Sequence, residues 1–180
     1  MTEEELEILR FPIGKFKKPE DFSAQVIQQF IADIEAFPEK LKKEVLHLSD
    51  EQLDTPYRPE GWTIRQVVHH CADSHINSIV RFKLALTEDK PVIKPYEENK
   101  WAELTDAKMP VLSALILLEG VHQKWVFLLK SMSESDFKRT FVHPQHGREL
   151  ALDVNTAIYA WHCHHHLAHI IELKKSKNWN

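Results

Sequence analysis

Glycine and cysteine are scarce in this sequence, and each shortage excludes a class of protein. Only four glycines occur in 180 residues, whereas Leu, Ile, Ala, Glu and Lys are abundant, which favours helices over a turn-rich β-sandwich. The two cysteines, Cys71 and Cys163, are too few for a disulfide framework and suit a reducing compartment. We therefore expect a helical, cytoplasmic protein.

Long runs of basic residues and long runs of apolar residues are also missing. No basic run is longer than the pairs Lys42-Lys43 and Lys174-Lys175, and the net charge of −4 argues against a nucleic-acid surface. No apolar run approaches the ~20 residues that a membrane span needs. The acidic residues 3–5 stand where a signal peptide would be basic and then apolar. We expect neither nucleic acid nor a membrane as a partner.

The sequence does contain long amphipathic segments. With 43% hydrophobic residues, the chain can form one domain, residues 1–180, around a real core. Thr63 and Gln66 form a capping box at the start of one helix, Asp153 is expected to cap another, and Pro38 should bend or restart the first. The apolar periodicity predicts four long helices, over about residues 21–48, 63–86, 111–130 and 153–177.

The remaining segments are expected to connect these helices. Residues 1–20 lack periodicity and predict an extended arm whose aromatic side chains dock on the body. Residues 49–58 and 90–99 contain prolines and predict non-helical connectors, and residues 137–152 predict a small hairpin or an irregular loop. The predicted fold is an all-α four-helix bundle with an N-terminal arm and a small insertion before the last helix.

The last helix carries the strongest chemical signal, because five of the 12 histidines lie in one short stretch of it. At about 100° per residue, His162 and His166 share one face, and His169 follows on the same stripe a turn later. His164 points to the opposite side and His165 lies between, so we expect these two to be solvated or to satisfy other histidines of the cluster. Two imidazoles one turn apart form a chelating pair, which is half of a metal site.

The second predicted helix offers a matching polar stripe. His70, Asn77 and Arg81 lie within about 20° of one another on a helix that is otherwise rich in apolar residues. Such a stripe needs a partner to satisfy it. The facing stripe of the last helix contains Tyr159 and the chelating pair. Packing the two stripes together brings His70 to the pair.

Three neutral imidazoles plus a water are a catalytic zinc arrangement. The alternative is that these histidines are solvated or satisfy one another, and the residues alone leave both interpretations open. Asp73, one turn beyond His70, is a candidate carboxylate to accept a hydrogen bond from the His70 ring nitrogen that does not bind the metal. Glu119 and His122 form a Glu-x-x-His pair, but its di-iron partner is missing, so we expect a core histidine. Both cysteines are expected to be small core residues.

The chain resembles the DinB-like metalloenzyme superfamily, and closely its YfiT branch of metal-dependent hydrolases. The resemblance implies an up-down-down-up four-helix bundle, one divalent metal per subunit, zinc or nickel, and often a homodimer. The family's ligand positions correspond to His70, His162 and His166, which the helical periodicity also selects. The matching segments span nearly the whole chain and lie at residues 11–14, 53–58, 61–70, 72–75, 81–84 and 161–170.

The resemblance implies two activities on small-molecule substrates. Relatives are hydrolases, or transferases that join a low-molecular-weight thiol such as bacillithiol to an electrophile. No glutamate stands out on either stripe as a general base, which modestly favours thiol activation. Asn77, Arg81 and Tyr159 would hold substrate or stabilise developing charge. A non-catalytic, metal-stabilised helical binding module is the third possibility, and a closed metal site would distinguish it.

Overall fold

The structure is a computed structural model that describes residues 2–144 and 147–179. Helix dominates it, and a two-stranded sheet is the sole β-structure other than isolated bridges in the described part of the chain. The four long helices are α2 (Ala24–Val45), α4 (Ile64–Thr87), α6 (Val111–Ser131) and α8 (Leu152–Ser176). The shorter elements are α1 (Glu3–Arg10), α3 (Asp50–Leu53), α5 (Glu98–Trp101), the 3-10 turn η1 (Thr105–Lys108), α7 (Glu134–Phe137), β1 (Thr140–His143) and β2 (Arg148–Ala151).

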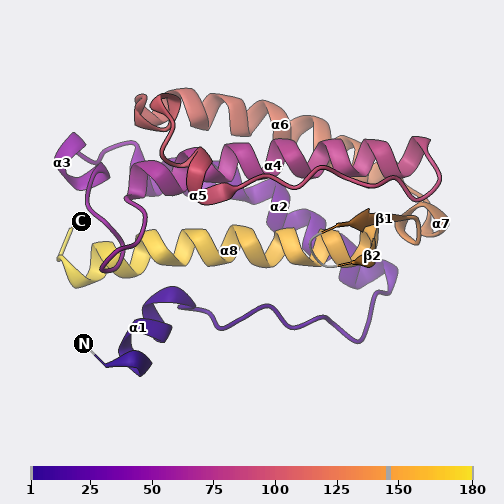
Figure 1. Cartoon of the computed structure of the whole chain (residues 1–180), viewed down its shortest axis with the longest axis horizontal. Coiled ribbons are helices and arrows are strands. Elements are labelled where there is room, and N and C mark those ends of the chain that lie inside the picture. The colour runs from indigo at the N-terminus through magenta and orange to yellow at the C-terminus, as the bar shows by residue number, and fades with distance from the viewer. Residues whose placement is uncertain (1, 145–146, 180) are drawn as a thin grey trace.

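The long helices form the expected bundle with up-down-down-up topology. In Figure 1, α4 and α6 run in one direction, and α2 and α8 run in the other. α2 packs on α6 and α8, and α4 also packs on α6 and α8, so α2 and α4 lie diagonally across the bundle. Because α4 and α6 are parallel, the connection between them must cross the length of the bundle, and it carries α5 and η1 on the way.

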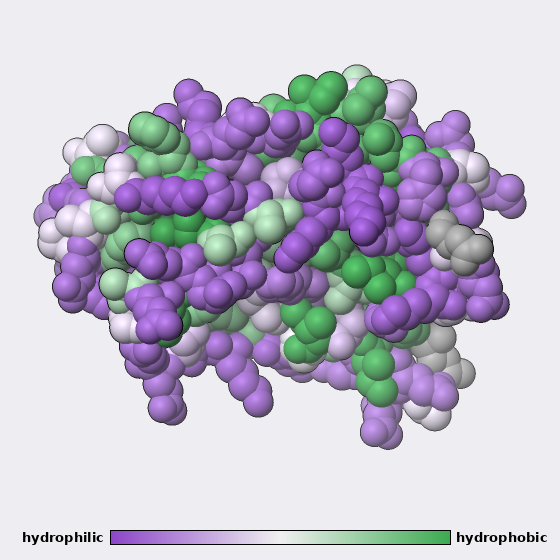
Figure 2. Space-filling model, turned by 180° about the vertical axis from the view of Figure 1, so that it is seen from behind, coloured by the Kyte–Doolittle hydropathy of each residue, from purple (hydrophilic) through white to green (hydrophobic). Residues whose placement is uncertain are grey.

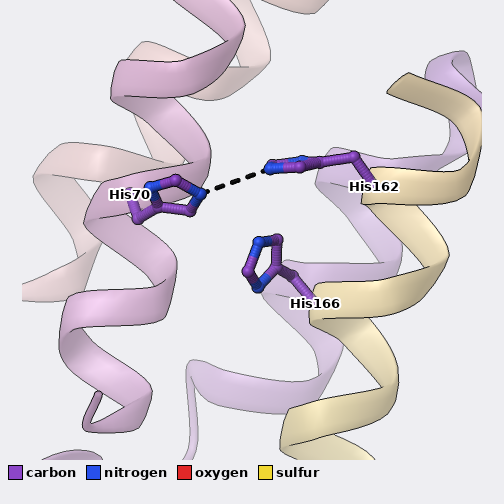
Figure 3. A group of neighbouring side chains, drawn as sticks. All are labelled: His70, His162 and His166. Carbon is purple, nitrogen blue, oxygen red and sulfur yellow. Dashed lines mark hydrogen bonds between the residues drawn. The ribbon is translucent and has the colours of Figure 1, made fainter. Parts of the chain in front are cut away.

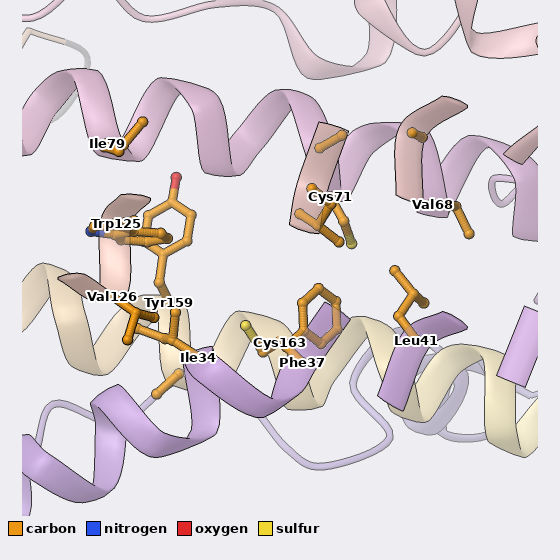
Figure 4. Packing of buried hydrophobic residues seen from close by; sticks show 14 of the residues in the cluster. Ile34, Phe37, Leu41, Val68, Cys71, Ile79, Trp125, Val126, Tyr159 and Cys163 are labelled. Atoms are coloured by element: carbon orange, nitrogen blue, oxygen red, sulfur yellow. The ribbon is translucent and has the colours of Figure 1, made fainter. Parts of the chain in front are cut away.

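The core lies between the four long helices (Figure 4). On α2 the buried side chains recur at intervals of three or four residues, so one face of this helix packs into the core along its length. Phe37, Phe82 and Trp125 are among the largest fully buried side chains, and each comes from a different helix. Burying a side chain of this size contributes about 1.5–3 kcal/mol to folding. Cys71 and Cys163 are buried free thiols, as expected.

The start of α4 is secured by polar contacts. The predicted capping box is confirmed. The backbone N–H of Gln66 donates to Thr63 Oγ1, and the backbone N–H of Thr63 donates to the side-chain oxygen Oε1 of Gln66. In the same turn, the buried guanidinium of Arg65 donates to the carboxylates of Asp54 and Asp50 in the α3 region. These contacts fix the first turns of the helix that carries His70.

The N-terminal arm differs from the prediction in its first half. Residues 3–10 form α1, an amphipathic helix that begins with a capping box between Thr2 and Glu5. The rest of the arm is not helical and docks through its aromatic side chains, as expected. Trp161 Nε1 on α8 donates to the Gly14 carbonyl, and the Phe16 ring contacts Trp161 edge-on.

Three helix boundaries also differ from the prediction. α2 continues through Pro38 without restarting, and residues 50–53 of the connector form the single-turn helix α3. α8 begins at Leu152 with Ala151 at its N-cap, so Asp153 is not the cap. Its carboxylate lies in the first helical turn, accepts from the Val154 N–H and pairs with Lys138.

The insertion before α8 is a hairpin. β1 and β2 pair antiparallel, with Phe141 opposite Leu150. The Ile93 N–H donates to the Val142 carbonyl, and the Val142 N–H donates to the Pro91 carbonyl. The hairpin therefore holds the connection between α4 and α6 in place above the bundle.

α6 leaves an apolar face on the surface. Apolar side chains gather along the upper edge of the view in Figure 2, over this helix. Leu112, Ile116 and Phe127 are exposed there, and Phe127 is 79% exposed. By length and composition alone, α6 could cross a membrane, but the core helices of bundles share both properties. Here α6 packs on α2 and α4.

Candidate metal centre

The bundle brings His70 of α4 to His162 and His166 of α8 (Figure 3). One ring nitrogen from each residue lies within 4.8 Å of the others. His70 Nε2 and His162 Nε2 are 3.2 Å apart, and the His162 and His166 rings meet edge-on with centroids 4.4 Å apart. The i,i+4 spacing on α8 and the packing of α4 against it produce this cluster, which we call the histidine triad.

The spacing within the triad suits one small divalent ion. Two imidazole nitrogens that each lie about 2.0–2.1 Å from a tetrahedral zinc are about 3.3 Å from one another. The His70–His162 separation of 3.2 Å is close to this value. The residues present therefore fit a metal ion of that size, and all three offer a nitrogen of the type that zinc and nickel accept.

Burial keeps the triad neutral. Desolvation, with a smaller contribution from the charge of His169, lowers the pKa of His70 to about 4. The pKa values of His162 and His166 are also lowered well below the ordinary value, first by burial and then by neighbouring imidazoles. A neutral imidazole has a free lone pair on one nitrogen. Near neutral pH the triad is thus in the protonation state that metal binding requires.

A pocket of about 900 Å³ opens beside the triad. The Trp62 ring covers one side of the cluster, with its centroid 4.6 Å from that of His70. The pocket reaches from the triad to the hairpin and the crossing connection, and its wall includes Trp62, Ser74, Arg81, Glu98, Tyr159 and Trp161. One side of the triad therefore faces a space large enough for a small substrate.

The three residues expected to act on substrate lie in different surroundings. Arg81 lines the pocket, and its charge opposes the effect of burial on the pKa values of Tyr159 and Glu98. Tyr159 also lines the pocket, but its hydroxyl donates to the Ser74 carbonyl and contacts Ser74 Oγ. Asn77 is not part of the pocket wall, because its amide donates to the Asp73 carbonyl on its own helix.

Glu98 is a pocket residue that the sequence reasoning missed. It lies in α5, within the connection between α4 and α6, and desolvation raises its pKa while Arg81 opposes the rise. Helical periodicity could not place it, because it belongs to neither stripe. The available signal was the Glu97-Glu98 pair in an otherwise proline-containing connector.

The other histidines of α8 have separate roles in the packing. His164 is partly exposed and pairs with Asp33, close to expectation. His165 is buried, which excludes the solvated alternative, because the N-terminal arm covers it and Trp161 stacks on its ring; its ring also contacts those of His166 and His169. His169 Nε2 donates to the Arg10 carbonyl, and its ring stacks on Tyr57.

Asp73 does not support His70 in the way expected. Burial and the nearby Asp106 raise its pKa to about 6, and among the described residues no hydrogen bond joins it to His70. His122 is a buried core histidine, as predicted, and Glu119 lies away from it on the exposed side of α6.

The bundle and the triad together define a four-helix protein with a candidate metal-binding cluster. The sequence matches the family model described as DinB superfamily over residues 33–170, and the chain belongs to this family. Relatives from Bacillus cereus and Bacillus anthracis are 52% identical over 95% of this chain and 98% of their own length. They bear the name "Putative metal-dependent hydrolase".

Two solved structures share the fold. YfiT from Bacillus subtilis, described as a probable metal-dependent hydrolase with an unusual four-helix bundle topology, is 46% identical, with a TM-score of 0.94. The match covers 96% of this chain and 99% of YfiT. A mycothiol-dependent maleylpyruvate isomerase matches with a TM-score of 0.61 at 14% identity, over 76% of this chain and 57% of the isomerase. This second likeness concerns the fold alone.

Proposed function

We propose that the protein is a metal-dependent hydrolase whose triad, His70, His162 and His166, holds one zinc or nickel ion. The observation that carries the proposal is the convergence of three neutral imidazoles from two helices at the wall of a pocket. The names of the relatives at 52% identity support the reaction class. The substrate is a small molecule that fits the pocket beside the triad.

The pocket argues for an enzyme over a metal-stabilised binding module. A structural site is closed by a fourth protein ligand, whereas a catalytic site leaves one position open. In the described part of the chain, the cluster around His70 contains three ligand-type residues and no fourth. A bound divalent ion would supply an acidified water at that position.

Glu98 gives hydrolysis a general base that the sequence did not reveal. Its side chain belongs to the pocket wall, and desolvation raises its pKa above that of a free glutamate, which brings it closer to neutral pH. Glu98 would accept a proton from the attacking water. Arg81, on the same wall, would stabilise the negative charge that develops on the substrate. Tyr159 would orient Ser74 and the wall of the pocket, because its own proton is bonded to a carbonyl.

Thiol transfer is the competing reaction, and one experiment separates the two. The zinc-loaded and nickel-loaded proteins are incubated with a panel of esters and amides, and separately with bacillithiol or another low-molecular-weight thiol plus an electrophile. We expect turnover of at least one ester or amide. Turnover of the thiol panel alone would contradict hydrolysis and establish the transferase.

The Glu98→Gln variant tests the proposed base. General-base catalysis contributes about 10²–10⁴-fold to a rate, so kcat for hydrolysis should fall by that order while metal content stays the same. Glu97→Gln is the matched control, since Glu97 is next in sequence, exposed and paired with Lys100. Equal kcat values in the two variants would remove Glu98 from the reaction.

A further inference from the structure

Two buried histidines, His75 of α4 and His122 of α6, lie behind the triad and belong to no proposed ligand set. His75 is 0% exposed and His122 is 2% exposed. Burying an imidazole without partners is costly, because its polar nitrogens lose their hydrogen bonds to water. The surrounding side chains are aromatic, with Phe37 and Trp125 in contact with both rings. The two histidines must therefore satisfy each other or another polar group.

They do so in one continuous chain of hydrogen bonds that ends on a triad member. His122 Nδ1 is 2.7 Å from the Ile34 carbonyl oxygen, and His75 Nδ1 is 2.6 Å from His122 Nε2. His75 Nε2 is in turn 3.1 Å from His162 Nδ1. Ile34 belongs to α2, so this chain joins all four long helices of the bundle. It leads from a backbone carbonyl to the triad.

The carbonyl at one end determines the direction of every bond. A carbonyl oxygen can only accept, so His122 Nδ1 must carry the proton. A neutral imidazole has one N–H, so His122 Nε2 accepts, and His75 Nδ1 is the donor. His75 Nε2 then accepts from the Nδ1–H of His162. His162 Nε2, which faces His70, is left with its lone pair.

Burial supports this assignment by keeping the chain neutral. The pKa of His122 is lowered to about 4, chiefly by desolvation. In the described part of the chain, no carboxylate makes a hydrogen bond or ion pair with either histidine, as a doubly protonated ring would need. With one proton on each ring, all three hydrogen bonds form only if each of the three rings carries its proton on Nδ1.

We propose that His75 and His122 are positioning residues that fix the tautomer and the orientation of His162, so that its Nε2 lone pair points towards His70 and His166. This inference rests on the proposed metal site. In many metal sites a carboxylate or a backbone carbonyl holds the ligand histidine from behind. Here the backbone carbonyl acts through two intervening imidazoles, which span the bundle core.

The first test needs no metal. Long-range ¹H–¹⁵N NMR spectra of the metal-free protein at pH 7.5 distinguish the two neutral tautomers of each histidine. We expect the Nδ1–H form for His75, His122 and His162. An Nε2–H form at His75 or His162 would overturn the proposal, whatever the protein binds. This result does not depend on whether any variant folds.

The second test measures Zn²⁺ affinity by competition with a chromophoric chelator. His75→Phe keeps the ring volume but removes both hydrogen bonds, and the affinity should fall by about 10- to 100-fold, the usual effect of losing a group behind a metal ligand. His75→Gln can place an amide oxygen towards His162 Nδ1 and an amide N–H towards His122, so it should recover most of the loss. His164→Phe, on the partly exposed side of α8, is the control.

The outcomes separate this inference from the proposed function. Failure of the wild-type protein to bind Zn²⁺ would contradict the proposed metal site. Wild-type affinity in a folded His75→Phe variant would contradict the positioning role and leave the metal site intact. An equal loss in His75→Gln and His75→Phe would also contradict it, because only bulk packing would then matter.

Discussion

His70 Nε2 and His162 Nε2 lie 3.2 Å apart although the two residues are 92 positions apart in the sequence. α4 and α8 hold them in place from opposite sides, and His166 completes the triad one turn along α8. The ligand nitrogens converge only when these helices pack. The unfolded chain has no such cluster, so binding of the proposed metal ion would be coupled to folding.

Zinc should therefore stabilise the protein against unfolding. A ligand that binds only the folded state contributes about 2.7 kcal/mol at a free concentration 100 times its Kd. We expect the Tm of the metal-free protein to rise by several degrees when Zn²⁺ is added. His166→Ala should fold without metal and show no such rise. A similar rise in this variant would mean that the stabilising ion binds elsewhere.

The metal-free protein should lose stability as the pH falls below about 6.5. Burial lowers the pKa values of His70 and His122 to about 4 in the folded state, whereas an unfolded histidine titrates near 6.5. Between these values the unfolded chain binds more protons, so protonation favours unfolding. Each such group contributes a slope of up to about 1.4 kcal/mol per pH unit.

Urea unfolding at pH 7.5 and pH 5.5 measures this loss. The free energy of unfolding should be lower at pH 5.5 by at least about 1.4 kcal/mol, the effect of one fully coupled group over one pH unit. Between pH 7.5 and pH 8.5 the titration of these two histidines should change the free energy of unfolding little. Equal stability at pH 7.5 and 5.5 would show that the two histidines are not buried as neutral rings.

Arg81 should act on the substrate and not on the metal. Its guanidinium lines the pocket, and its charge reaches Glu98. Arg81→Ala should lower kcat/KM by about 10²-fold or more, the order seen when one stabilising donor is removed. Metal content should be unchanged, and Arg81→Lys should restore part of the activity. Normal turnover in Arg81→Ala would remove this role.

The homodimer that the family resemblance implies would need an apolar surface, and the exposed face of α6 offers one. Ile116 and Phe127 are 63% and 79% exposed, and contiguous apolar patches often mark surfaces that bind another protein. We expect a dimer in sedimentation velocity. Ile116→Asp with Phe127→Asp should shift it to a monomer that still binds metal. A monomeric wild-type protein at micromolar concentration would contradict this expectation.

The sequence predicted the part of the site that follows helical periodicity. His162 and His166 are one turn apart, and His70 belongs to the polar stripe of a helix with a clear capping box, so local rules bring them to facing surfaces. The fold followed from the same four apolar periodicities. The hairpin also had a local signal, in two short apolar segments around a turn.

Contacts between distant segments could not be predicted in this way. His75 is five positions from His70, about 140° away on the helix, and its role depends on His122 from α6 and a carbonyl of α2. Glu98 reaches the pocket only because the connection between two parallel helices crosses the bundle. α1 was missed although its signal is local, a capping box between Thr2 and Glu5 at the start of a short amphipathic segment.

Metal stoichiometry in His70→Ala is the most direct test of the triad. Wild-type protein and the variant are loaded with Zn²⁺, separated from free ion and analysed by mass spectrometry for metal per chain. His164→Ala is the control, since His164 lies on α8 between the proposed ligands His162 and His166 but is partly exposed and pairs with Asp33. We predict one metal per chain in wild type and His164→Ala, and substoichiometric metal in a folded His70→Ala protein. One tightly bound metal per chain in His70→Ala would contradict the proposed site.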